Sequence, residues 1–152
     1  MFFWVILLVL LADQVSKYVV HTTMIHGASV VIIPSVLSLT CVYNSGAAFG
    51  LFAEKTGYLI VLTVILILGV IIGYRKLPLK RPLVLYGVAF IVGGGLGNLL
   101  DRLRHGYVVD FFDLHFWPVF NLADVAIVVG AGLLFLDLWL THRREKEMES
   151  NV

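Results

Sequence analysis

The sequence GGGLGNLLDR at 93–102 ends one long apolar segment, and FNLAD at 120–124 begins another. If both segments cross a membrane as antiparallel helices, Asp101 and Asp124 lie at the same depth, because one helix ends where the other starts. Two carboxyl groups at one membrane boundary predict a shared acid site. The rest of the chain is interpreted around this pair.

The composition is that of an integral membrane protein. Of the 152 residues, 60% are hydrophobic and only 14% are charged, whereas about a quarter of a soluble domain is charged. The mean hydropathy is +0.96. Because no low-complexity linker divides the chain, we expect one domain over residues 1–152. The net charge of +1 is small and the basic residues are scattered, so we expect no nucleic-acid partner.

Four apolar segments have the length of a membrane span, since a hydrocarbon core about 30 Å thick requires about 20 helical residues. We predict an all-α membrane protein with four spans, at about 2–21, 57–74, 82–101 and 121–141. The first segment lacks the basic start and the small-residue cleavage site of a signal peptide, so we expect it to stay attached. The second has no ionisable residue before Arg75 and is interpreted as lipid-facing.

The basic residues orient these spans. Seven of the eleven Lys and Arg residues lie in RKLPLKRP at 75–82 and in the C-terminal tail. Because positively charged loops stay in the cytoplasm, we expect both termini on the cytoplasmic side and residues 22–56 and 102–120 outside. The predicted acid pair then lies near the outer face of the membrane.

The first outer segment contains two distinct patterns. VVIIPSVLSLTCVY at 30–43 is rich in β-branched residues and predicts short strands at the membrane interface. NSGAAFG at 44–50 predicts a tight turn around Asn44 and Gly46, where the backbone can approach another group closely. A plain connecting loop is the alternative for this turn.

Ionisable residues inside the spans are candidates for function. Asp13 and Lys17 are four residues apart and share a helical face. They could form a structural ion pair in the bundle or contact other acids of the site. Asp137, near the other end of the fourth span, is expected to pair with the basic tail.

Glycines are concentrated just before the first acid of the pair. They indicate a backbone that another helix or a ligand approaches closely, and they are Gly93, Gly94, Gly95 and Gly97. Asn98 follows at a spacing that puts it on one helical face with Asp101 and Arg102.

Two neighbouring carboxyl groups cannot both ionise without a large cost, so they share a proton. One can then accept a proton from water while the other donates a hydrogen bond to a carbonyl, which is aspartic-protease chemistry. A proton-coupled transporter is the alternative, although transport sites usually lie near the midplane and across an internal repeat.

Other reactive residues give no competing pattern. The five histidines lack a metal-ligand spacing, and for His105 and His115 we expect interfacial roles. The lone Cys41 has no partner for a disulfide and is interpreted as a small buried residue. We therefore expect no metal and no organic cofactor.

Five motifs together resemble those of lipoprotein signal peptidase, also called signal peptidase II, a family of bacterial membrane aspartyl proteases. In chain order they are DQVSK at 13–17, NSGAAFG at 44–50, GGGLGNLLDR at 93–102, VVDFFD at 108–113 and FNLAD at 120–124. The resemblance implies four transmembrane helices with a small extracytoplasmic β-cradle and a short outer-loop helix. Val125 departs from the family pattern, in which Ser is frequent.

On this resemblance we expect Asp101 and Asp124 to be the catalytic pair. It also implies residues that bind substrate or brace the site, namely Asp13, Lys17, Asn44, Gly46, Asn98, Arg102 and Asn121. The implied reaction removes the signal peptide of a diacylglyceryl-modified prolipoprotein on the amino side of the lipidated Cys. The implied place is the bacterial cytoplasmic membrane, and we expect a monomer that contacts membrane lipid and the lipidated substrate.

Overall fold

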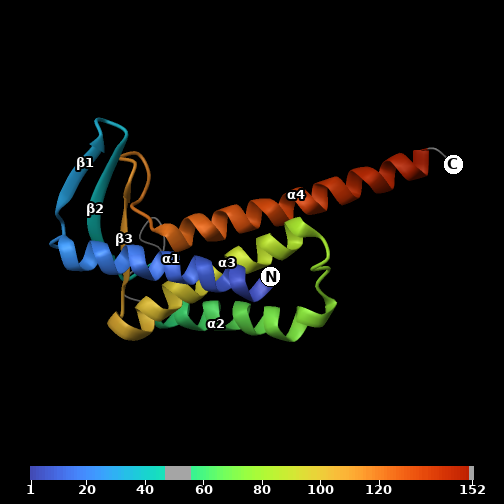
Figure 1. Cartoon of the computed structure of the whole chain (residues 1–152), viewed down its shortest axis with the longest axis horizontal. Helices are drawn as coiled ribbons and strands as arrows, with labels where there is room; N and C mark the ends of the chain where they lie inside the picture. Colours follow the sequence, from blue (N-terminus) through green and yellow to red (C-terminus); the bar gives the residue numbers. More distant parts are fainter. Residues whose placement is uncertain (47–55, 151–152) are drawn as a thin grey trace.

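The computed structural model describes residues 1–46 and 56–150. Its helices form a bundle with a small sheet at one end, and they are α1 (Phe2–Thr23), α2 (Thr56–Gly73), α3 (Pro82–His105) and α4 (Leu122–Ser150) (Figure 1). A short 3-10 helix, η2 (Tyr74–Lys76), follows α2. Within the described residues, four helical segments are long and apolar enough to cross a membrane, as the four predicted spans require.

Helix α3 is the centre of the bundle and packs against α1, α2 and α4. Its glycines allow these contacts: a Cβ atom added to Gly93 would lie 2.9 Å from the Cβ of Val9 on α1. A Cβ atom on Gly94 would overlap the main chain of Ala123 on α4. The expectation that the glycines mark a close approach is therefore confirmed for α1 and α4.

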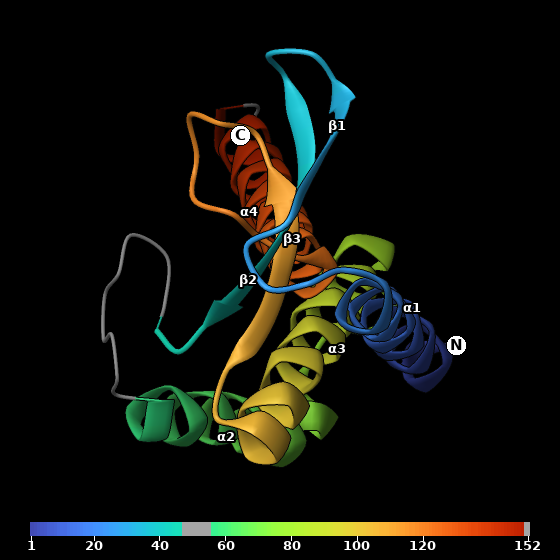
Figure 2. The ribbon, with the colours of Figure 1, turned by 90° about the vertical axis from the view of Figure 1, so that its left-hand side faces the viewer.

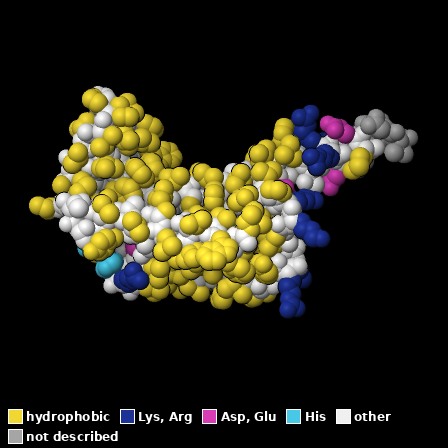
Figure 3. Space-filling view, in the orientation of Figure 1, with side chains coloured by type: hydrophobic (Ala, Val, Ile, Leu, Met, Phe, Trp, Pro, Cys, Tyr) yellow, Lys and Arg dark blue, Asp and Glu magenta, His cyan; other side chains and the backbone are white. Residues whose placement is uncertain are grey.

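Helix α2 is covered by little of the protein, since Leu59 is its one buried residue. Apolar side chains also cover the outside of the bundle in the space-filling view (Figure 3). A surface this apolar is stable against lipid and not against water. The lipid-facing interpretation of the second span agrees with this burial pattern.

The sheet has three antiparallel strands in the order β1 (Ser29–Ile33), β2 (Leu37–Asn44) and β3 (Val108–Asp113). It rises from the end of the bundle beside α1 (Figure 2). The strands expected at 30–43 are confirmed as β1 and β2, whereas β3 was not predicted. The outer-loop helix that we expected is not found in the described segments 24–46 and 106–121, and residues 47–55 lie outside the described part.

A small apolar core attaches the sheet to the helices. Val20 of α1 packs with Cys41 of β2 and with Val109 and Phe111 of β3. The Cys41 side chain is fully buried, as expected for a small core residue. This core fixes β3 against the C-terminal ends of α1 and α3, where the polar residues gather.

Two details differ from the prediction. Helix α3 continues to His105 and ends at Gly106, whose φ of 80° closes the helix. Asp101 therefore lies inside the helix, about one turn before its end. Asp137 pairs with Arg81, which precedes α3, at 3.2 Å, and not with the C-terminal tail, because α3 and α4 pack side by side there.

Candidate active site

Strand β3 places Asp110 in the interior next to the start of α4. Its side chain is only 2% exposed. Oδ1 accepts a hydrogen bond from Nδ2 of Asn121 at 2.6 Å, and Oδ2 accepts one from Nδ2 of Asn44 at 2.8 Å. Asn44 lies at the end of β2, and Asn121 caps α4. The two amides therefore hold the Asp110 carboxyl group from two elements that are far apart in the sequence.

The pKa of Asp110 is raised from its ordinary value to about 7. Burial is the largest cause, and the negative charge of Asp124 adds to it. The hydrogen bonds from Asn44 and Asn121, and the charge of Lys17, act in the opposite direction. Asp110 therefore holds a proton up to near-neutral pH.

Asp124 lies in the first turn of α4 and faces the same space as Asp110. Its Oδ1 accepts a hydrogen bond from Nδ2 of Asn98 at 2.8 Å. Both carboxyl groups line a cavity of about 290 Å³ together with Asn44, Asn98 and Arg102. The segment from Trp117 to Phe120 also lines this cavity. Asp110 and Asp124 thus share one cavity, which is the arrangement that the sequence predicted for Asp101 and Asp124.

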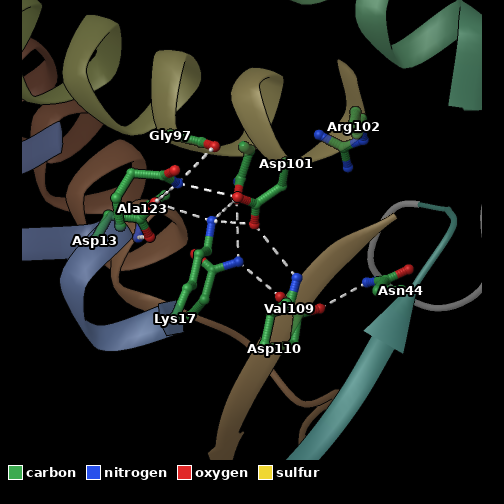
Figure 4. Close-up of polar contacts among 12 residues, drawn as sticks. Asp13, Lys17, Asn44, Gly97, Asp101, Arg102, Val109, Asp110 and Ala123 are labelled. Atoms are coloured by element: carbon green, nitrogen blue, oxygen red, sulfur yellow. Dashed lines mark hydrogen bonds and ion pairs between the residues drawn. The ribbon is translucent and has the colours of Figure 1, made fainter. Parts of the chain in front are cut away.

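Asp101 does not join Asp124 in this cavity. Its Oδ2 lies 3.0 Å from Nζ of Lys17, and its Oδ1 accepts a hydrogen bond from Nε2 of Gln14 at 2.9 Å (Figure 4). It lines a separate cavity with these two residues of α1 and Arg104. The expected pairing of Asp101 with Asp124 is therefore corrected: the face of α3 that carries Asp101 turns toward α1, and Asp110 takes the expected place.

Lys17 binds two acids at once. Its Nζ lies 2.9 Å from Oδ2 of Asp13 and 3.0 Å from Oδ2 of Asp101, and all three side chains are buried. Oδ1 of Asp13 also accepts a hydrogen bond from the main-chain N–H of Ala123 at 2.9 Å, and this bond connects α1 to the start of α4. The pair predicted from the four-residue spacing is confirmed, and it also contacts an acid of α3.

The turn that follows β2 brings a cation to the cavity. The main-chain N–H of Gly46 donates to Oδ1 of Asn44 at 2.9 Å, which confirms a tight turn at 44–46. Nη2 of Arg102 donates to the carbonyl oxygen of Gly46 at 3.0 Å. Nε of Arg102 is buried and has no hydrogen-bond partner among the described residues. The rest of the predicted turn, residues 47–50, lies outside the described part.

His105 and His115 do not line the cavity that contains Asp110 and Asp124. His115 makes a hydrogen bond with Ser38 at 3.0 Å, and His105 stacks on Tyr107. Across residues 1–46 and 56–150, no three His, Cys, Asp or Glu side chains are grouped so that they could hold a metal ion.

Sequence reasoning missed Asp110 and Gln14. The signal for Asp110 was present in VVDFFD, because an acid at the centre of an apolar strand must have polar partners when it is buried. Gln14 carried no comparable signal, since a single amide in a membrane helix fits many environments.

Comparison with known proteins decides the family. Residues 5–140 match the family model described as signal peptidase (SPase) II. The chain belongs to the signal peptidase II family. It is thus an aspartic peptidase of the membrane, and the resemblance read from its five motifs is confirmed.

Curated relatives and solved structures agree with the signal peptidase II assignment. The lipoprotein signal peptidase of Pelotomaculum thermopropionicum is 50% identical over 132 residues, which are 87% of each chain. That of Moorella thermoacetica is 52% identical over 134 residues, 88% of this chain and 89% of the relative.

Two similar solved structures are described as bacterial membrane enzymes. One has a TM-score of 0.90 at 30% identity and covers 96% of this chain and 92% of its own. The other has a TM-score of 0.81 at 31% identity, with coverage of 90% and 91%. The fold of this signal peptidase II chain is therefore that of a membrane enzyme over nearly its full length.

Proposed function

We propose that this signal peptidase II removes signal peptides from diacylglyceryl-modified prolipoproteins, with water activated between Asp110 and Asp124. The names of the curated relatives support the lipoprotein substrate. The observation that carries the dyad is that these two carboxyl groups line one cavity, where the charge of Asp124 raises the cost of ionising Asp110. Asp101 is absent from that cavity and is left out of the dyad.

The surroundings of the two acids divide their roles. Asp124 lies at the amino end of α4, where the helix dipole favours negative charge, and Arg102 lines the same cavity. Asp110 is almost fully buried, and because its pKa is raised to about 7 it keeps its proton up to near-neutral pH. Asp124 is thus the base that takes a proton from water, and Asp110 is the acid.

The reaction follows from this division. The water oxygen attacks the scissile carbonyl carbon while Asp124 accepts the water's proton, and the proton of Asp110 moves to the carbonyl oxygen. The tetrahedral intermediate then returns that proton to Asp110, and its C–N bond breaks as the proton on Asp124 passes to the leaving nitrogen. The dyad ends in its starting state.

A second cavity supports recognition of lipid. It has a volume of about 310 Å³, lies along the outer start of α4 and shares Trp117, Phe120, Asp124 and Val128 with the first. Its other walls are apolar and include Leu114 and Phe116. A lipidated Cys bound here would place the peptide bond on its amino side next to the dyad, which supports cleavage at that bond.

The placement of charges supports the proposed orientation. Strand β3 and the start of α4, which carry the two acids, lie at the sheet end of the bundle, whereas the start of α1, the connection from α2 to α3 and the far end of α4 lie toward the other end (Figure 1). Lys and Arg side chains are concentrated at that other end in the space-filling view (Figure 3). With basic segments in the cytoplasm, the site faces the outer side of the cytoplasmic membrane.

The test is to incubate the purified protein in detergent with a diacylglyceryl-modified precursor peptide and to identify the products by mass. Asp110→Asn and Asp124→Asn should each lower kcat by more than about 1,000-fold, because the dyad acts as one unit. Asp101→Asn should lose only about 10- to 100-fold, as residues that orient a site do.

Two outcomes would reject this assignment. One is substantial turnover by a correctly folded Asp110→Asn protein, and the other is a complete loss confined to Asp101→Asn and Asp124→Asn. If no cleavage occurs with the unsubstituted protein, proton flux in liposomes tests the transporter alternative.

A further inference from the structure

Lys17 does not line the cavity of the two acids, but it contacts Asn98, which does. Its ammonium group has three N–H donors, and the structure gives it three acceptors. Two are Asp13 and Asp101, and the third is Oδ1 of Asn98 at 2.8 Å. Lys17 is 3% exposed, so its charge is screened very little by water.

The carboxamide of Asn98 can take only one orientation in these surroundings. Its oxygen accepts hydrogen bonds from Lys17 and, at 3.1 Å, from Nδ2 of Asn121. Its nitrogen is thereby directed at Oδ1 of Asp124, 2.8 Å away. A flipped amide would bring its NH₂ group against two donors and its oxygen against a carboxylate, which is unfavourable at all three contacts.

We propose that Lys17 is a positioning residue that acts through Asn98 to hold an N–H donor on Asp124, the base of the proposed reaction. This inference rests on the proposed function, because it assigns a task within that dyad. Asn98 is the contact that touches Asp124, and Lys17 sets its direction.

Other charged groups around Asp124 come from three elements. Helix α1 contributes Asp13 and Lys17, α3 contributes Asp101 and Arg102, and β3 contributes Asp110. Asp13, Lys17 and Asp101 together carry one net negative charge. Lys17 therefore does not act as an isolated positive charge, and its effect on Asp124 should depend on the oriented amide.

The test compares variants that keep this charge balance. Lys17→Met alone would leave two buried acids uncompensated and could prevent folding. The pair Lys17→Met with Asp101→Asn keeps the net charge of the group at minus one. Asn98→Leu removes the amide itself while keeping a side chain of similar size. Folding of each is checked by thermal unfolding and size-exclusion chromatography.

The readout is the pH dependence of kcat/KM for the lipidated precursor. Loss of the N–H donor makes the charged form of Asp124 less stable, so the acidic limb should move up by about one pH unit. The charge-matched pair and Asn98→Leu should each produce this shift. Combining all three substitutions should give no further shift, because both changes remove the same hydrogen bond.

Arg104→Gln is the matched control. It also removes one cation, from an exposed position near the C-terminal end of α3, the helix that carries Asn98. Arg104 contacts Gln14 and does not reach Asn98. Its acidic limb should stay where the unsubstituted enzyme has it.

The role of Lys17 would be overturned if the acidic limb of kcat/KM does not move in the charge-matched pair. It would also be overturned if the shifts in the acidic limb add when all three substitutions are combined. Failure of the dyad itself is distinguishable, because it would appear as turnover by Asp110→Asn or Asp124→Asn.

Discussion

Asn121 and Asp124 hold each other at the start of α4 by two reciprocal hydrogen bonds. The main-chain N–H of Asp124 donates to Oδ1 of Asn121 at 3.0 Å, and the main-chain N–H of Asn121 donates to Oδ2 of Asp124 at 3.2 Å. This is a capping box in which an aspartate takes the position usually held by Glu or Gln. The bonds that begin the helix also fix the carboxylate that we propose as the base, so FNLAD encodes both a helix start and part of the proposed active site.

Asn121 therefore has two tasks that a pair of substitutions separates. Asn121→Ala removes the cap and the donor to Asp110, so the free energy of unfolding should fall by about 1 kcal/mol or more and turnover should fall strongly. Asn121→Ser keeps a capping oxygen but has no Nδ2 donor, so it should regain most of the stability and little of the activity. The measurements are thermal unfolding in detergent and kcat. Full activity in Asn121→Ser would show that the bond to Asp110 is unimportant.

The raised pKa of Asp110 predicts the alkaline side of the activity profile. Cleavage requires protonated Asp110, so kcat/KM should fall as pH rises through about 7, with limbs that belong to the coupled pair. The hydrogen bond from Asn44 lowers the pKa of Asp110. Asn44→Ala should thus move the alkaline limb to higher pH. Thr40→Val is the control, because Thr40 bonds Asp113 and not Asp110. An alkaline limb that moves downward in Asn44→Ala would contradict the assignment.

Two neighbouring glycines of α3 should respond differently to a methyl group. A Cβ atom at position 94 overlaps the carbonyl oxygen of Ala123, next to the dyad, whereas at Gly95 it makes an ordinary contact of 3.6 Å with Thr63. Gly94→Ala should lower the free energy of unfolding by about 1–3 kcal/mol and reduce turnover. Gly95→Ala should cause no fall in either. Thermal unfolding and a cleavage assay at saturating substrate decide the point, and equal effects would mean that the α3–α4 spacing does not limit function.

Cleavage should depend on lipidation of the precursor. A precursor whose lipobox Cys is replaced by Ser carries no acyl chains and loses about 0.8 kcal/mol of partitioning per buried CH₂. It also loses the group that we place in the apolar cavity lined by Phe116 and Trp117. We expect poor cleavage or none, measured by product mass against the lipidated precursor at equal concentration. Equal rates for both would reject recognition through lipid.

Labelling of single cysteines should establish the orientation. In a Cys41→Ser background, cysteines introduced within 75–81 should react with an impermeant reagent only after the cytoplasmic side is opened. Cysteines introduced within 114–116 should react from outside intact cells. Labelling of 75–81 from outside would place the dyad at the cytoplasmic face, where a substrate exported across the membrane could not meet it.

Much of the fold follows from the sequence alone. Apolar length predicted the four spans, and β-branched residues at 30–43 predicted two of the three strands, because burial in lipid and residence in a pleated sheet each select their own residue types. The glycines of α3 and the pair of Asp13 and Lys17 were also predicted, since helical spacing determines which residues share a face. These inferences need only the distance between residues along one element.

The choice of Asp110 and Asp124 as the proposed dyad needed the tertiary structure. Depth in the membrane put Asp101 and Asp124 at one level, but depth says nothing about the direction in which each side chain points around its helix axis. Packing of α3 against α1 turns Asp101 to Lys17. Pairing of β3 with β2 brings Asp110 instead to Asn121, at the start of α4. The contacts that select the second acid join residues from four elements, and such a selection arises only when those elements pack together.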